Sequence, residues 1–278
     1  MQLPEPYSEN ELTPEELADL KHAKEILENP GFAMKVAGYI GKPIEFAIEK
    51  IDSETINRAT SKALGKVLDV AIGSLDEAAQ SDTPANLQHK LLVGGSGAVG
   101  GFFGMAALAV ELPISTTIML RSIADVARSQ GHDLNQMQTR LACLEVFSLG
   151  STKNSEDDAS ESAYFAARAT LAYEMRAALQ SVSKMSSKAI QDALQRGQMP
   201  VLIRFINTIA SRFGIVVSEK VAAQAVPLVG AAGGAAINIL FIEHFQQMAE
   251  GHFIVRRLEQ KYGEEKISAL YNALPVER

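Results

Sequence analysis

Isolated charged and polar residues within apolar helical patterns are the first candidates for chemistry in this sequence. Glu111 and Glu145 both lie in apolar surroundings, where an unpaired carboxylate would be costly. Arg121 and Asp125 are four residues apart and can pair on one face of a helix. A catalytic or ligand site would need the fold to gather Glu111, Arg121, Glu145, Asn238 and His244. The alternative is that each of these groups has its own structural ion pair or hydrogen bond.

Two histidines near the C-terminus, His244 and His252, have side chains of the type that bind metal ions. Eight helical residues separate them by about 12 Å, which is too far for one ion on a straight helix. The sequence contains neither H-E-x-x-H nor E-x-x-H, so we expect no metal site. Arg256 and Arg257 follow, and they either contact anionic lipid headgroups or belong to a solvated helix end.

A glycine-rich segment, Gly95 to Gly100, matches the dinucleotide-binding pattern G-x-G-x-x-G. That pattern needs a strand before it and a second strand beyond it, whereas Pro113 leads into another helical pattern. Ser96 falls short of a nucleophile elbow, because Ala98 stands where the last glycine belongs. No G-x-x-x-x-G-K-[ST] loop occurs, and we expect no cofactor.

Two uncharged stretches, Leu91 to Val110 and Val221 to Ile242, are rich in glycine and alanine. Small residues four apart on one helix face allow close packing in lipid or in protein. The residues predicted for membrane or partner contact are Gly97, Gly101, Gly104, Gly230 and Gly234. Both stretches reach the roughly 20 residues that span a bilayer. A tightly packed soluble core, reversible membrane insertion and stable spanning all fit this pattern.

Helix start and stop signals predict an all-α fold, a multi-helix bundle with two Gly/Ala-rich apolar helical hairpins. A capping box at Thr13 and Glu16 opens a helix within an N-terminal segment, 1–30, and the remaining helical domain covers 32–273 with a polar loop at 151–162. Pro113 is expected to break a helix, and Asp133 is expected to cap another. The predicted helices cover 32–51 with an interruption at 41–43, 53–80, 114–130, 137–149, 163–196 and a segment from Pro200.

Composition excludes some classes of function. A net charge of -7 and a pI near 5.4 argue against a nucleic-acid-binding protein, which needs a basic footprint. The single cysteine, Cys143, excludes an intrachain disulfide and fits a reducing compartment. The acidic, proline-containing N-terminus lacks the features of a signal peptide. We therefore expect a cytoplasmic protein that is also peripheral to the inner membrane if the apolar stretches contact lipid.

Three blocks of sequence carry a family resemblance. They are Glu111-Leu112-Pro113 with Met119 to Ala124, Cys143 to Phe147, and Gly233 to Asn238 running through His244-Phe245-Gln246 to His252-Phe253 and Arg256 to Glu259. With these blocks the chain resembles the EcsC family of bacterial proteins from about Phe32 to Tyr271. The resemblance implies bacterial origin, a cytoplasmic or membrane-peripheral role, and a link to ABC transport or secretion through partnership. It implies no reaction, cofactor or catalytic residue.

These observations favour a non-enzymatic helical protein that associates reversibly with the membrane or a membrane protein. The alternative is a soluble enzyme, such as a hydrolase, with its polar site between helices. A third reading is a scaffold that binds only protein through an exposed apolar groove.

Overall fold

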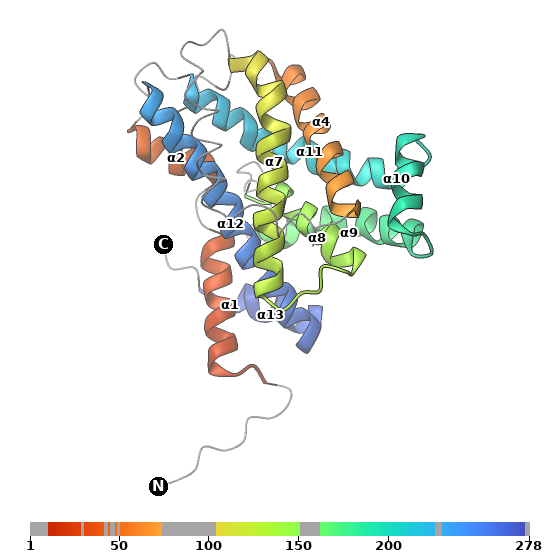
Figure 1. Cartoon of the computed structure of the whole chain (residues 1–278). Coiled ribbons are helices and arrows are strands. Elements are labelled where there is room, and N and C mark those ends of the chain that lie inside the picture. The colour runs from red at the N-terminus through yellow and green to blue at the C-terminus, as the bar shows by residue number, and fades with distance from the viewer. Residues whose placement is uncertain are drawn as a thin grey trace.

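The computed structural model describes residues 11–28, 31–41, 44, 48, 51–73, 104–150, 162–225 and 230–275. These ranges contain helices and no strand, which confirms the all-α prediction (Figure 1). The elements are α1 (Pro14–Leu27), α2 (Phe32–Ile40), α4 (Ser53–Gly73), α7 (Gly104–Ser129), α8 (Met137–Glu145), the 3-10 helix η1 (Val146–Ser148), α9 (Ala163–Val182), α10 (Ser187–Gln195), α11 (Pro200–Gln224), α12 (Gly230–Tyr262) and α13 (Glu264–Ala273).

The longest of these helices, α12, contacts α1, α2, α7, α11 and α13. Phe241 and Phe245 of α12 pack edge to face at 5.3 Å, and both contact the ring of Phe213 on α11. Nearer the end of α11, the side chain of Gln224 donates to that of Asn238 at 3.2 Å. The pairing order reverses along the two helices, so α11 and α12 are antiparallel neighbours.

Unlike α11, α7 runs parallel to α12. Gln246 of α12 donates to the hydroxyl of Ser122 on α7 at 2.7 Å. Further along both helices, Arg257 donates to Gln130, also at 2.7 Å. Because the sequence offset between the partners is nearly constant, α7 and α12 begin at the same end of the molecule, which is the upper end in Figure 1.

Several helix boundaries follow the sequence signals. Thr13 and Glu16 form the predicted capping box, with N–H to side-chain oxygen distances of 3.2 and 3.0 Å. Gly41 ends α2 in the left-handed conformation at φ +70°, and Pro200 begins α11. The helix predicted to reach residue 80 is described only to Gly73.

The break predicted at Pro113 is wrong, because α7 continues through it from Gly104 to Ser129. Proline removes one backbone donor from a helix and disturbs the preceding turn. The hydroxyls of the next turn do not replace that donor, because Ser115 and Thr116 donate to the carbonyl of Leu112 and Thr117 donates to that of Pro113. With α7 packed against α4 and α12, tertiary contacts outweigh the local signal.

Two further boundaries differ from the predictions for a local reason. Asp133 does not cap α8, because its carboxylate accepts the N–H of Asn135 at 2.9 Å within a preceding turn. The single helix predicted over 163–196 is divided into α9 and α10. Ser186 makes the division, since its hydroxyl accepts the N–H of Ala189 and caps α10.

The described part of the N-terminal segment packs on the rest of the chain. α1 lies against α12 and α13. Lys24 of α1 is buried, and its ammonium donates to the carbonyls of Tyr271 and Leu274 at 2.7 and 2.6 Å. This side chain satisfies carbonyls at the C-terminal end of α13 and thereby ties the two terminal helices together.

Candidate functional site

The first candidate site is the end of the molecule at which α7 and α12 begin, which we name the apolar end. It comprises α2, residues 104–115 of α7 and residues 230–241 of α12 (Figure 1). The described parts of the two uncharged stretches, which begin α7 and α12, both lie at this end. Lys35 and Glu111 are the charged residues in these three segments.

The helix α2 has apolar residues on its exposed side as well as on its buried side. Phe32 and Val36 are fully buried, whereas Met34 is 62% and Tyr39 57% exposed. Lys35 is the one charged residue in this helix. A surface helix ordinarily has a polar outer face, so α2 presents a surface suited to apolar contact. Two further large apolar side chains at this end are exposed: Ile114 of α7 and Ile239 of α12.

Two glycines at this end, Gly38 and Gly234, have open space beside them among the described residues. A Cβ built at Gly38 or at Gly234 would have no heavy atom within 4 Å among the described residues. The close helix packing expected at Gly234 is therefore not found between described parts of the chain. Of the other predicted contact glycines, Gly104 and Gly230 begin α7 and α12, and Gly97 and Gly101 lie outside the described residues.

Two of the predicted catalytic candidates are already paired near the apolar end. Lys220 donates to Glu111 at 2.8 Å, and its ammonium lies 4.9 Å from the ring centroid of Phe241. The lysine side chain is 2% exposed, so this charge needs a partner within the protein. Asn238 accepts from Gln224. Both candidates therefore have structural partners.

A second cluster, the buried polar network, joins α8, α9 and α12. Its members are Glu145, Tyr164, Arg168, His252 and Glu259. Arg168 donates to both oxygens of Glu259 at 2.6 and 3.0 Å and also to the hydroxyl of Tyr164 at 3.3 Å. The arginine is the most exposed side chain of the five, at 12%. The network is thus enclosed by the protein.

The order of donors in this network fixes the tautomer of His252. Arg168 can only donate, so the oxygen of Tyr164 accepts from it. Since the described residues offer the tyrosine O–H no other acceptor, we assign its proton to the 3.0 Å bond with Nδ1 of His252. The imidazole proton then lies on Nε2, which is 3.6 Å from a carboxylate oxygen of Glu145. That distance is too long for a hydrogen bond.

Burial shifts the pKa values of the two acid–base members in opposite directions. It raises the pKa of Glu145, an effect that the nearby Arg168 and Arg256 oppose. Burial lowers the pKa of His252 well below its usual value, and the same two guanidinium groups lower it further. His252 is consequently neutral at pH 7. Since these side chains are enclosed, the network supports a structural connection between helices rather than a substrate site.

His244 is separate from this network. It is 1% exposed, and neither ring nitrogen has a hydrogen-bond partner among the described residues. The ring lies 5.8 Å from that of Phe32, and a Cβ at Gly150 would overlap its Nε2 atom. Burial lowers the pKa of His244 to about 3. In the described ranges no three histidine, cysteine or acidic side chains gather into a metal site.

Arg121 is the fifth predicted site residue and lies on α7. The spacing of Arg121 and Asp125 allows them to pair, but Asp125 pairs with Arg128 instead. The Nε atom of Arg121 is buried without a hydrogen-bond partner in the part of the chain described. The five candidates therefore have separate surroundings, and the structure does not connect them into one polar site by any described hydrogen bond or ion pair.

The two arginines predicted to contact headgroups make contacts within the protein. Arg257 donates to Asp19 at 2.5 Å and to Gln130 at 2.7 Å. Arg256 lies 3.4 Å from Glu145, and its side chain is 12% exposed. Headgroup contact at these residues stays a prediction, and this geometry does not favour it.

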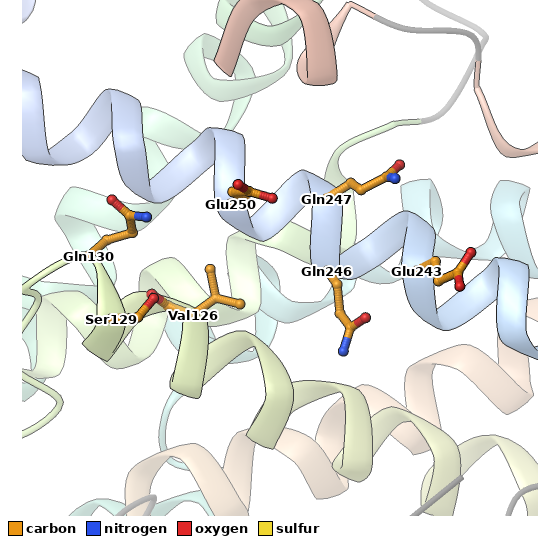
Figure 2. Close-up of a pocket in the computed structure, with 7 residues that line it drawn as sticks. All are labelled: Val126, Ser129, Gln130, Glu243, Gln246, Gln247 and Glu250. Carbon is orange, nitrogen blue, oxygen red and sulfur yellow. The ribbon is translucent and has the colours of Figure 1, made fainter. Parts of the chain in front are cut away.

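A polar groove of about 510 Å³ lies between α7 and α12 (Figure 2). Its amide and carboxylate groups bond to neighbouring helices: Lys35 donates to Gln247 at 2.8 Å, and His22 lies 3.2 Å from Glu250. The lining residues are Val126, Ser129, Gln130, Glu243, Gln246, Gln247 and Glu250. The groove thus consists largely of contacts that hold α1, α2 and α7 on α12.

Within the described ranges, α11 is a helix long and apolar enough to cross a bilayer, with a mean hydropathy of 1.5. Half of the apolar window is buried inside the protein, and a core helix of a soluble protein passes the same test. Glu219 and Lys220 of this helix are also buried. These features support a core role for α11 over a membrane span.

The sequence reasoning missed Lys220, which is the partner of Glu111, and the network residues Tyr164, Arg168 and Glu259. One signal was present: Tyr164 and Arg168 are four residues apart and share a helix face. The pairing of that face with α12 depends on contacts across 88 to 91 residues of sequence, which spacing within one helix cannot indicate.

Comparison with known protein families gives a match over most of the chain. The sequence model of the EcsC protein family matches residues 33–258, which is most of the chain. No curated protein and no solved structure matches it. The matched range includes the apolar end from Ala33 onward and excludes α1 and α13.

Proposed function

The chain belongs to the EcsC protein family, and we propose that it is a non-enzymatic helical protein that binds reversibly to the cytoplasmic face of a bacterial membrane through its apolar end. A membrane-bound transporter of the ABC type, which the family resemblance implies, is its proposed partner there.

The exposed apolar face of α2 is the observation that supports this proposal most directly. Met34 and Tyr39 lie in solvent at 62% and 57% exposure on a helix whose opposite face is buried. Transfer of a large apolar side chain from water contributes about 1.5 to 3 kcal/mol. A few such side chains give weak, reversible attachment, comparable to that of a single acyl chain.

Low charge at this end also favours contact with lipid. The carboxylate of Glu111 is compensated by Lys220, whereas Lys35 donates only to the neutral amide of Gln247 and therefore limits how deeply this end can insert. The sequences that lead into α7 and α12 are uncharged from Leu91 and from Val221. Peripheral attachment agrees better than spanning with α11, half of whose apolar window is buried in the protein.

Vesicle co-sedimentation tests the proposal. The wild-type protein is expected to sediment with neutral phosphatidylcholine vesicles, and Met34→Ser is expected to weaken binding about tenfold, the equivalent of losing one apolar side chain. The double variant Met34→Ser, Tyr39→Ser is expected to lose binding further. Leu17→Ser is the matched control, since Leu17 is 43% exposed on α1, outside the apolar end.

Absence of wild-type binding to any vesicle would exclude the proposal. Equal weakening by Leu17→Ser and Met34→Ser would also oppose it, since the effect would then not belong to the apolar end. Thermal unfolding of each variant distinguishes lost contact from lost fold.

A further inference from the structure

Five cations lie exposed around α10, on a surface that we name the basic surface. Arg176 is on α9, Lys188 is on α10, Arg204 is on α11, and Lys184 and Arg196 lie in the turns that flank α10. The described residues form no ion pair with any of them; Arg176 donates only to the carbonyl of Ala172. Lys62 and Lys66 of α4 are also exposed without a described ion pair, so the basic surface is distinguished by the five cations gathered around one short helix.

The packing of α9 on α11 brings these cations to one corner. The side chain of Arg212 on α11 donates to that of Thr170 on α9, and Figure 1 shows α9 and α11 running in opposite directions. That register puts Arg204 level with the turn of α9 that contains Arg176. Because α9 and α11 run in opposite directions, the turn that leaves α9 and the turn that enters α11 lie at the same end of this helix pair. α10 connects the two turns and packs on α4, with Ile190 buried.

The local charge differs in sign from that of the chain. Residues 162–212 contain seven lysines and arginines and two acidic residues, a net charge of +5, whereas the chain has a net charge of -7. One of the acidic residues, Asp192, lies on the exposed side of α10 between Lys188 and Arg196 and reduces the charge of the surface. The remainder of the chain is correspondingly acidic.

Two exposed apolar side chains lie among the cations. Tyr173, one turn before Arg176, is 72% exposed, and Ile203, next to Arg204, is 37% exposed. Tyrosine beside basic residues is typical of surfaces at the level of lipid headgroups. Clusters of four to eight basic residues on an amphipathic helix are likewise typical of contact with anionic lipid.

We propose that the basic surface binds the headgroups of anionic phospholipids. This inference rests on the proposed membrane association and deepens it by naming the lipid class. The exposed Ile203 and Tyr173 among the cations favour a headgroup layer, and the chain's net charge of -7 argues against the extended basic footprint that a nucleic acid needs.

The two contact surfaces together define an orientation. The basic surface is at the N-terminal end of α11, and α2 contacts α11 on the opposite side of the molecule (Figure 1). α11 has 25 residues and a length of about 37 Å. Both surfaces reach one bilayer only when α11 lies along its plane.

The test compares neutral phosphatidylcholine vesicles with vesicles that also contain phosphatidylglycerol. The triple variant Lys184→Gln, Lys188→Gln, Arg196→Gln is expected to bind the anionic vesicles about a hundredfold more weakly than the wild type, and to bind the neutral vesicles equally well. Raising salt from about 0.1 M to about 1 M should weaken wild-type binding to anionic vesicles in the same way, because the screening length falls from about 10 to about 3 Å.

The control triple variant Lys21→Gln, Arg58→Gln, Arg128→Gln makes the same change in net charge at exposed cations that have acidic neighbours. An equal loss in both triple variants would overturn the inference, since binding would follow net charge alone. Equal wild-type binding to neutral and anionic vesicles would overturn it while leaving the proposed function intact. Displacement from vesicles by single-stranded RNA through the same three residues would assign the surface to nucleic acid instead.

Discussion

Two buried histidines on α12 show how strongly surroundings determine the properties of one residue type. His252 accepts a hydrogen bond from Tyr164, whereas His244 has no partner for either ring nitrogen among the described residues. Burial without a partner holds the pKa of His244 at about 3. An unfolded chain would restore a value near 6.5. Below that pH the unfolded state binds a proton that folded His244 does not, so stability falls as pH falls.

We therefore expect the free energy of unfolding to decrease on acidification, by up to about 1.4 kcal/mol per pH unit from His244 alone. His252, with a lowered pKa, adds to this loss, and Glu145, with a raised pKa, opposes it. In urea unfolding between pH 7 and pH 4, the free energy of unfolding of His244→Leu should fall less steeply with decreasing pH than that of the wild type. The variant lacks the imidazole that takes up a proton on unfolding. His22→Gln is the control, because His22 is exposed at 53%. Identical slopes for wild type and His244→Leu would contradict the assignment.

Among the helices, the close packing of α1 on α12 depends on a single glycine, Gly251. A Cβ at Gly251 would lie 2.7 Å from the Cγ atom of Leu27 and 3.2 Å from the carbonyl oxygen of Ala23. Leu27 and Ala23 are buried, so their atoms have little room to shift away from an added Cβ. The close approach of α1 to α12 therefore requires glycine at this position.

We expect Gly251→Ala to lower the free energy of unfolding by about 1 to 3 kcal/mol, since extra atoms in a packed contact force the helices apart. Gly65→Ala is the matched control within another helix. No heavy atom lies within 4 Å of a Cβ at Gly65, so this variant should raise stability by up to about 1 kcal/mol. Urea unfolding of both variants measures the difference. A stabilising effect at both positions would show that α1 does not depend on the close contact.

For the molecule as a whole, the packing of α11 inside the protein predicts that the protein can be washed off a membrane. The charged residues Glu219 and Lys220 are buried within α11, and half of its apolar window faces the protein core. We expect alkaline carbonate to release the native protein from a membrane pellet of its own cells. Retention in the pellet together with an integral membrane protein would instead indicate a stable span.

The helical class, the family and the helix boundaries that depend on neighbouring residues can be predicted from the order of amino acids alone. The capping box at Thr13 and the start at Pro200 need only a few local atoms, and the match to the EcsC family needs only the order of residues. Helix continuity at Pro113 was different, because packing against α4 and α12 outweighed a local signal.

The partners of the candidate charged residues depend on the tertiary structure. Glu111 meets Lys220 across 109 residues, and Glu145 meets His252 and Arg256 across 107 and 111. Spacing within a helix predicts which side chains share a face, but the partner of that face depends on how whole helices pack. For the same reason the sequence indicated two apolar stretches, while the parallel packing of α7 and α12 brought their described parts to one end of the molecule.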